Sequence, residues 1–133
     1  FLNARVDSFH VFPDDPKKTL DEAIRRGNAY AEAGGECIFY LFLHSAEIIG
    51  RIAKEVKAPI SILAGPQSPS VSQLQDLGVA RVSYGSGFLK AAITGAKQLA
   101  QEILEKGTCD LLKTGMQTPE ISALVARRKQ VIL

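Results

Sequence analysis

The sequence predicts an α/β fold in which four βα units follow one another along a parallel sheet. Four short apolar runs of strand type alternate with longer stretches in which apolar residues recur at helical spacing. The clearest run, CIFYLFL within residues 36–43, lacks the polar alternation of a half-exposed strand, so other elements should cover both its faces. Glycines at positions 34, 78 and 107 are placed to end three of the helical stretches.

Two closures of the sheet are compatible with this pattern. Parallel βα units form either an open doubly wound sheet or a (β/α)8 barrel, of which four units are half. The strand and helix periodicities do not distinguish the two. The chain begins without methionine, and its first residues already suit the interior of a strand. We therefore expect a fragment of a longer protein, which favours half of a barrel.

The first unit is expected to consist of a strand over residues 1–6, a loop over residues 8–16 and a helix. Prolines and aspartates in the loop are typical chain breakers. The helix should begin at Thr19, because Thr19 and Glu22 have the spacing of a capping box. The second unit pairs the strand over residues 36–43 with a helix that follows directly.

The remaining elements complete the pattern. In chain order they are a strand over residues 59–64, a short helix with the capping box Ser70–Gln73, a strand over residues 79–84, a helix over residues 87–106 and a last helix from Thr118. The inward face of the long helix is predicted to consist of Leu89, Ala92, Ala96, Leu99 and Ile103. Pro119 suits the first turn of the last helix, where its missing N–H removes no helical hydrogen bond.

The composition argues against several classes of partner. Sixteen basic and 14 acidic residues give a net charge of +2, which provides no electrostatic case for binding nucleic acid or a membrane surface. No apolar run approaches the ~20 residues of a membrane span, and no signal peptide is visible. Cys37 and Cys109 lack metal-ligand spacing and are expected to be reduced thiols in a cytoplasmic protein.

Several segments, in a fixed order, resemble one enzyme family. They are NARVD at residues 3–7, LDEAIRR at 20–26, YAEAG at 30–34, ILAGP at 62–66, LGVARVS at 77–83, GSG at 85–87 and KTGM at 113–116. Together, across residues 1–117, they resemble the phosphoenolpyruvate mutase/isocitrate lyase superfamily, and in particular its phosphoenolpyruvate mutase branch.

The resemblance implies a (β/α)8 TIM barrel in which residues 1–117 supply βα units five to eight. Residues 118–133 would form a C-terminal helix of the kind that swaps onto a neighbouring subunit in this family. The implied activity is that of a Mg²⁺-dependent lyase or mutase acting on a small 2-oxo acid or phosphonate. Such enzymes cleave or form C–C or P–C bonds through an enolate-like intermediate.

The family's metal ligands and catalytic cysteine lie upstream of the matching segments. This chain is therefore expected to hold no catalytic and no metal-binding residue, and to be inactive alone. The Mg²⁺ ligands would come from the N-terminal half of the barrel. A half-barrel leaves open strand edges and an exposed apolar sheet face, so we expect it to pair with that half or with a second copy.

Arg5 is the one functional residue that the resemblance carries over, as a contact to an anionic group of the substrate. Active sites of (β/α)8 barrels lie at the carboxyl ends of the strands, and a guanidinium there can bind a carboxylate or phosphonate bidentately. The alternative role for Arg5 is a structural ion pair with Asp7. Ser61, on the third strand, is a second candidate for substrate binding, and a hydrogen bond to backbone is its alternative role.

Gly85, Ser86 and Gly87 follow the fourth strand and open a helix. Free backbone N–H groups at a helix start favour anions, so these residues are candidates for binding an anionic group of the substrate. The alternative is a tight turn in which glycine only satisfies the backbone. For His10 and His44, which follow strands, a solvated loop position is favoured over a general acid or base role.

Three positions depart from the family pattern. Val6 stands where threonine is usual, Phe42 where Pro-Gly is common, and Ser61 where many members carry asparagine. These departures leave the substrate open. They also favour a second hypothesis, that the chain is a non-catalytic half-barrel which binds a phosphorylated or dicarboxylate ligand, or an oligomerising scaffold.

Overall fold

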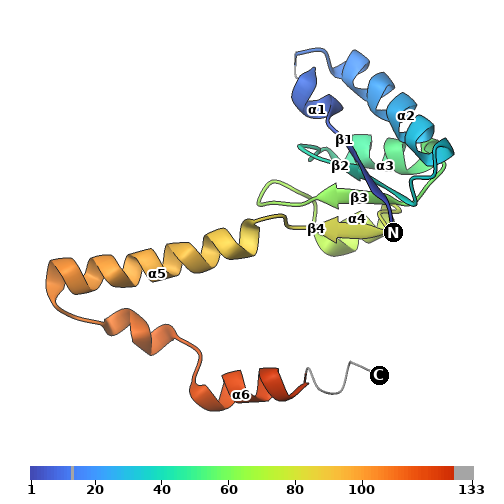
Figure 1. Ribbon diagram of the computed structural model, residues 1–133. Helices are drawn as coiled ribbons and strands as arrows, with labels where there is room; N and C mark the ends of the chain where they lie inside the picture. The colour runs from blue at the N-terminus through green and yellow to red at the C-terminus, as the bar shows by residue number, and fades with distance from the viewer. Residues whose placement is uncertain (13, 128–133) are drawn as a thin grey trace. The chain divides into compact units, whose positions relative to one another are not determined.

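The computed structural model describes residues 1–12 and 14–127 of the chain. The chain divides into two compact units, Phe1–Phe88 and Leu89–Leu133, which are described separately below. The first unit contains the sheet and the helices that connect its strands, and the second contains most of the longest helix and the C-terminal elements (Figure 1).

The first unit is built on a parallel sheet whose strand order follows the sequence. Its strands are β1 (Asn3–Val6), β2 (Cys37–Tyr40), β3 (Ile60–Leu63) and β4 (Arg81–Ser83). A doubly wound sheet reverses its strand order at a switch point, and these four strands contain no reversal. The predicted alternation of parallel strands and helices is confirmed, in the order that successive units of a (β/α)8 barrel have.

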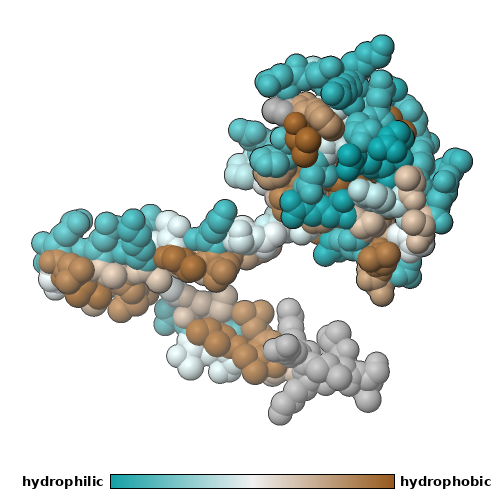
Figure 2. Space-filling model, turned by 45° about the horizontal axis from the view of Figure 1, so that its top comes forward, coloured by the Kyte–Doolittle hydropathy of each residue, from teal (hydrophilic) through white to brown (hydrophobic). Residues whose placement is uncertain are grey.

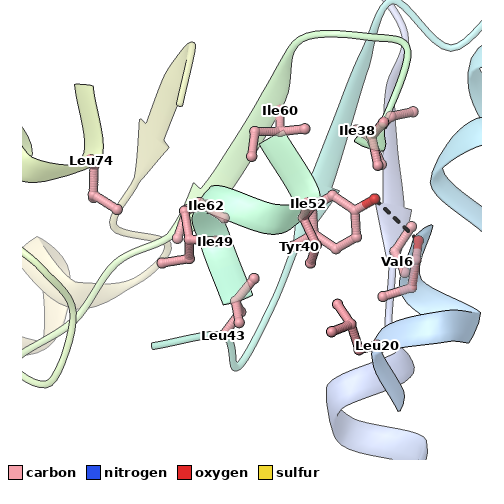
Figure 3. Close-up of a cluster of buried hydrophobic side chains, with 12 residues drawn as sticks. Val6, Leu20, Ile38, Tyr40, Leu43, Ile49, Ile52, Ile60, Ile62 and Leu74 are labelled. Carbon is pink, nitrogen blue, oxygen red and sulfur yellow. Dashed lines mark hydrogen bonds between the residues drawn. The ribbon is translucent and has the colours of Figure 1, made fainter. Parts of the chain in front are cut away.

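Helices α1 (Ser8–Val11), α2 (Pro16–Glu32), α3 (Ala46–Glu55) and α4 (Val71–Asp76) connect the strands. One hydrophobic core joins the helices to the sheet (Figure 3). Its buried members are Val6, Leu20, Ala23, Ile38, Tyr40, Leu43, Ile49, Ile52, Val56, Ile60, Ile62 and Leu74. Because alternate residues of a strand face opposite sides, these strand positions define the helix-covered face of the sheet.

Tyr40 is the largest fully buried side chain of this core. Its hydroxyl donates a hydrogen bond of 3.2 Å to the carbonyl oxygen of Ala23 in α2 (Figure 3). Burial raises the pKa of the Tyr40 phenol above its usual range, because the phenolate would lose its hydration. A Cβ at Gly27, one turn along α2, would collide with the same hydroxyl. The close approach of Tyr40 therefore explains why a glycine lies in the interior of this helix.

The start of α2 differs from the prediction. The helix begins at Pro16 rather than Thr19, and the side chain of Asp15 caps it by accepting a hydrogen bond of 3.0 Å from the backbone N–H of Lys18. Glu22 forms salt bridges with Arg25 and Arg26 instead of closing a capping box. The sequence between β1 and α2 also contains the short helix α1, where a loop was expected.

Other predicted boundaries are confirmed. Ser70 and Gln73 form a reciprocal capping box at the start of α4. Gly34 and Gly78 follow the ends of α2 and α4 with φ of +100° and +90°, a conformation that glycine adopts without strain.

The second strand is shorter than its apolar run. β2 ends at Tyr40, although Leu41 and Leu43 are still buried. Phe42 between them has φ of +59° and a side chain that is 50% exposed. The left-handed backbone at Phe42 turns the chain out of the sheet, and the strand ends for that reason.

The second unit takes up the long helix α5 (Gly87–Lys106) from Leu89 onward, followed by the 3-10 helix η1 (Asp110–Thr114) and by α6 (Thr118–Arg127). The side chain of Glu102 joins α5 to η1, because its carboxylate accepts hydrogen bonds from the backbone N–H groups of Asp110 and Leu111. The start of α6 at Thr118 is as predicted, whereas η1 lies between the two predicted helices, where no helical turn was expected. Residues 128–133, the end of the predicted last helix, lie outside the described residues.

The prediction that one face of α5 is buried is wrong for the described residues. No residue of this helix is buried, and Leu89 and Ile103 are 62% and 50% exposed. The helix is nevertheless amphipathic, with apolar side chains along one side (Figure 2). The pattern predicted an apolar face correctly, but it does not specify which element covers that face. Within the described residues, no helix is both long and apolar enough to cross a membrane.

Candidate substrate site at the carboxyl edge of the sheet

The four strands are parallel, so their carboxyl ends meet at one edge of the sheet. The segments that leave this edge are α1 after β1, the Phe42–His44 segment after β2, the loop at residues 64–70 after β3 and the Gly85–Gly87 turn after β4. Ligands of parallel α/β sheets bind at this edge, whether the sheet is open or closed.

A row of side chains crosses the sheet on the face that the helices leave uncovered. The strand register pairs Arg5 with Phe39, Phe39 with Ser61, and Ser61 with Arg81. The neighbours of these residues along the strands, including Val6, Ile60 and Ile62, belong to the helix-packed core. Two of the predicted site residues, Arg5 and Ser61, therefore lie on the same face of the sheet, separated by one strand.

The Arg5 guanidinium forms an ion pair with Asp7. Its Nε donates to the Asp7 carboxylate at 2.8 Å and 3.1 Å, and Nη2 lies 2.8 Å from Oδ1. The Arg5 side chain is 57% exposed, and exposed pairs of this kind add little stability. A guanidinium carries five N–H donors, so binding Asp7 leaves donors for a second anion.

Ser61 is fully buried, and its Oγ accepts a hydrogen bond of 3.1 Å from Nη1 of Arg81. Sequence reasoning missed Arg81, although a cation at the start of an apolar strand was visible. Its positive charge also acts on the Cys37 thiol at the amino end of β2, and opposes the burial that raises the pKa of this thiol. Arg81 therefore occupies the Ser61 hydroxyl, and substrate binding by Ser61 stays a prediction.

In the turn after β4, the N–H groups of Gly85 and Gly87 already donate hydrogen bonds within the turn. Gly85 has φ of +51°, and its N–H donates to Ser83 Oγ at 3.3 Å. The N–H of Gly87 donates to the Tyr84 carbonyl oxygen at 2.8 Å. These bonds are those of a tight turn, which was the alternative reading of the Gly85-Ser86-Gly87 segment. Anion binding by this segment remains a prediction.

Two contacts between side chains join the first three loops of the edge. The rings of His10 and Phe42 lie 5.2 Å apart between centroids, which connects α1 to the segment after β2. His44 Nδ1 lies 3.3 Å from Ser68 Oγ, and that oxygen also accepts a hydrogen bond of 2.9 Å from the Gly65 N–H. The segments that follow β1, β2 and β3 are therefore linked to one another at this edge.

The described residues offer no metal centre. Within residues 1–12 and 14–127, no three His, Cys, Asp or Glu side chains come together as metal ligands would. Asp14 and Asp15 are adjacent acids before α2, but Asp15 is occupied as the cap of this helix. These residues do not fit a Mg²⁺ site.

Comparison with known proteins gives the family. Residues 1–104 match the sequence profile of the family described as phosphoenolpyruvate phosphomutase. The chain belongs to the phosphoenolpyruvate phosphomutase family. The match extends from β1 into α5, and so covers the whole sheet and the Arg5 position.

Individual relatives are consistent with this family. A 2-methylisocitrate lyase from Halalkalibacterium halodurans is 33% identical over 103 residues, which make up 74% of this chain and 34% of the relative. The crystal structure of a candidate lyase/mutase from Burkholderia cenocepacia J2315 superposes with a TM-score of 0.80 at 29% identity, over 94% of this chain and 44% of that one.

A more distant structure contributes to the fold alone. It is a phosphonopyruvate hydrolase in complex with oxalate and Mg²⁺, with a TM-score of 0.66 at 24% identity over 96% of this chain and 45% of that one. The chain spans less than two fifths of the length of the curated relatives that it matches.

Proposed function

We propose that this chain is one half of the barrel of a Mg²⁺-dependent lyase or mutase that acts on a small 2-oxo acid or phosphonate, and that this half binds an anionic group of the substrate. The observation that carries the proposal is Arg5, a half-exposed guanidinium near the carboxyl end of β1 in a chain of the phosphoenolpyruvate phosphomutase family. Its remaining N–H donors suit a carboxylate or phosphonate.

In this proposal, β1 to β4 are strands five to eight of a (β/α)8 barrel, over residues 1–117. The sequential parallel order of the four strands and their superposition on less than half of a larger relative support this assignment. The uncovered face of the sheet, with Arg5 and Ser61, would then be the inside of the barrel. Residues of the first four units would complete it.

Arg5 would hold an anionic group of the substrate and orient it for bond cleavage. The phosphonopyruvate hydrolase of the same fold is in complex with oxalate, a small dianion, and Mg²⁺. Oxalate resembles the enolate of a 2-oxo acid in charge and planarity, so an analogous ligand suits a guanidinium at this edge. Because the described residues do not fit a Mg²⁺ site, the ligands of the metal would belong to the other half of the barrel.

Assembly is a second part of the proposal. Exposed apolar residues on α5 and α6, including Leu104 at 85% and Val125 at 63%, favour burial against another chain or another part of the protein. We expect a homo-oligomer in which the C-terminal helix of residues 118–133 packs on a neighbouring subunit. The same observation favours the alternative function, an oligomerising scaffold without catalysis.

The test uses the complete gene product with 2-methylisocitrate, oxaloacetate and phosphonopyruvate, each in the presence of Mg²⁺. We expect at least one of them to be consumed, and EDTA to stop the reaction. If none is consumed although oxalate binds with Mg²⁺, the non-catalytic alternative is supported. If none is consumed and oxalate does not bind, the lyase or mutase function and the ligand-binding form of the alternative are both refuted, and only the oligomerising scaffold is left.

A further inference from the structure

The backbone at Phe42 is the main conformational outlier at the candidate site. Phe42 has φ of +59°, and it is the one residue other than glycine with positive φ within residues 1–12 and 14–127. This conformation is unfavourable for a bulky side chain, and it persists only where the surroundings fix it. Buried Leu41 and Leu43 on either side provide that constraint.

The left-handed turn has a consequence for the Phe42 side chain. A regular continuation of β2 would place Phe42 on the same face as the core residue Tyr40, and Leu43 on the opposite face. Instead, Leu43 joins the helix-packed core, while the Phe42 ring lies outside it and is 50% exposed. The strain therefore holds a large apolar ring at the carboxyl edge, where solvent or a ligand can reach it.

The ring is also supported from the side. His10, in the helical turn that follows Arg5 and Asp7, lies with its ring 5.2 Å from that of Phe42 and inclined by 31°. Two residues along the chain, His44 contacts Ser68 of the next loop, which fixes the segment that carries Phe42. An exposed aromatic ring that packs against His10 and is held by a strained backbone is suited to packing against a ligand.

From this geometry we infer that Phe42 is a specificity residue, and that the protein takes 2-oxo acids whose carbon chain carries an apolar substituent. Arg5 and Asp7 lead directly into the turn that supports Phe42, so a substrate held by Arg5 would extend its carbon chain along this edge. The inference rests on the proposed function, because it needs a 2-oxo acid bound at Arg5.

The experiment compares two ligands that share one head group. Pyruvate and 2-oxo-4-methylpentanoate are titrated with Mg²⁺ into the complete gene product and into its Phe42→Gly and Phe42→Leu variants, by calorimetry. Oxalate is titrated into the wild type as the probe of the proposed function. Thermal unfolding of each variant is recorded alongside, and Phe42→Gly should be at least as stable as the wild type because glycine accepts the positive φ.

We expect the wild type to prefer the branched acid over pyruvate by about tenfold, as a site that packs against added methyl groups does. Phe42→Gly should bring this ratio close to one, and Phe42→Leu should retain most of it because leucine keeps the apolar bulk. If the wild type binds oxalate but shows no preference, or Phe42→Gly retains the preference, the inference is overturned and the proposed function stands. If the wild type does not bind oxalate, both fall together.

Discussion

Gly27 offers a quantitative test of how α2 packs on the sheet. A Cβ at this position would collide with the Tyr40 hydroxyl and would lie 3.1 Å and 3.3 Å from the two γ-carbons of Val56. Neither neighbour can retreat easily, because both side chains belong to the buried core. Gly27→Ala therefore overpacks the interface between α2, β2 and the end of α3.

The magnitude follows from two opposing terms. Alanine is favoured over glycine inside a helix by about 1 kcal/mol. Overpacking of a dense core costs about 1–3 kcal/mol, and contacts on three atoms place Gly27→Ala toward the upper end. The expected net effect is a destabilisation of about 1–2 kcal/mol, which corresponds to a lower Tm by roughly 3–8 °C for a domain of this size.

Tyr40→Phe provides the matching half of a double-mutant cycle. Alone it removes the hydrogen bond to the Ala23 carbonyl and should destabilise by about 1 kcal/mol. In the Gly27→Ala/Tyr40→Phe double mutant the hydroxyl that collides is gone and only the two milder contacts with Val56 remain, so the helical preference for alanine should offset the lost hydrogen bond to within about 1 kcal/mol. Additive single effects would instead predict about 2–3 kcal/mol of destabilisation.

The assay is urea denaturation of the complete gene product, followed by far-UV circular dichroism. Gly95→Ala in α5 is the control, because a Cβ there would meet no atom within 4 Å and should stabilise by up to about 1 kcal/mol. A Gly27→Ala variant as stable as the wild type, or a cycle without coupling, would refute the packing described for Tyr40.

Two further predictions concern caps and charges. Ser70→Ala removes the capping box of α4 and should destabilise the protein by about 1 kcal/mol. Gln75→Ala, at an exposed position of the same helix, is the control and should change stability by less than about 0.5 kcal/mol. Equal denaturation midpoints for the two variants would contradict the role of the cap. Hydrogen bonds from Arg25 and Arg26 hold the pKa of Glu22 at about 2, below its ordinary 4.5. Because the folded pKa is depressed, the stability from Glu22 is present above pH 4.5 and is lost as the pH falls toward 2. Glu22→Gln should therefore flatten the acid limb of the stability curve in this window, and an unchanged limb would argue against the pairing.

Several helix boundaries could be predicted from short sequence patterns. The capping box at Ser70 and the glycines after α2 and α4 were readable because the cap and the backbone geometry depend on adjacent residues alone. The start of α2 was misassigned because two cap signals compete there. Asp15 followed by Pro16 is a cap with proline at the first helical position, and it prevails over the Thr19–Glu22 spacing.

The candidate site was only partly predictable. Arg5 came from the family resemblance, and the structure adds its pairing with Asp7. The hydrogen bond between Arg81 and Ser61 depends on the register of β3 against β4, which the sequence does not encode locally. The positive φ of Phe42 was also missed, because an apolar run contains no signal for a residue that leaves the strand.

The most direct test of the central claim is the affinity for oxalate in the presence of Mg²⁺, measured by calorimetry on the complete gene product and two variants. Arg5→Met should weaken binding by about 10- to 100-fold, as expected when a hydrogen bond to a charged group is lost. Arg51→Met is the matched control, because Arg51 is a half-exposed arginine paired with Glu55 on α3, and it should bind as the wild type does. Equal oxalate affinity in the wild type and Arg5→Met would contradict the role of Arg5 as the substrate-anion contact.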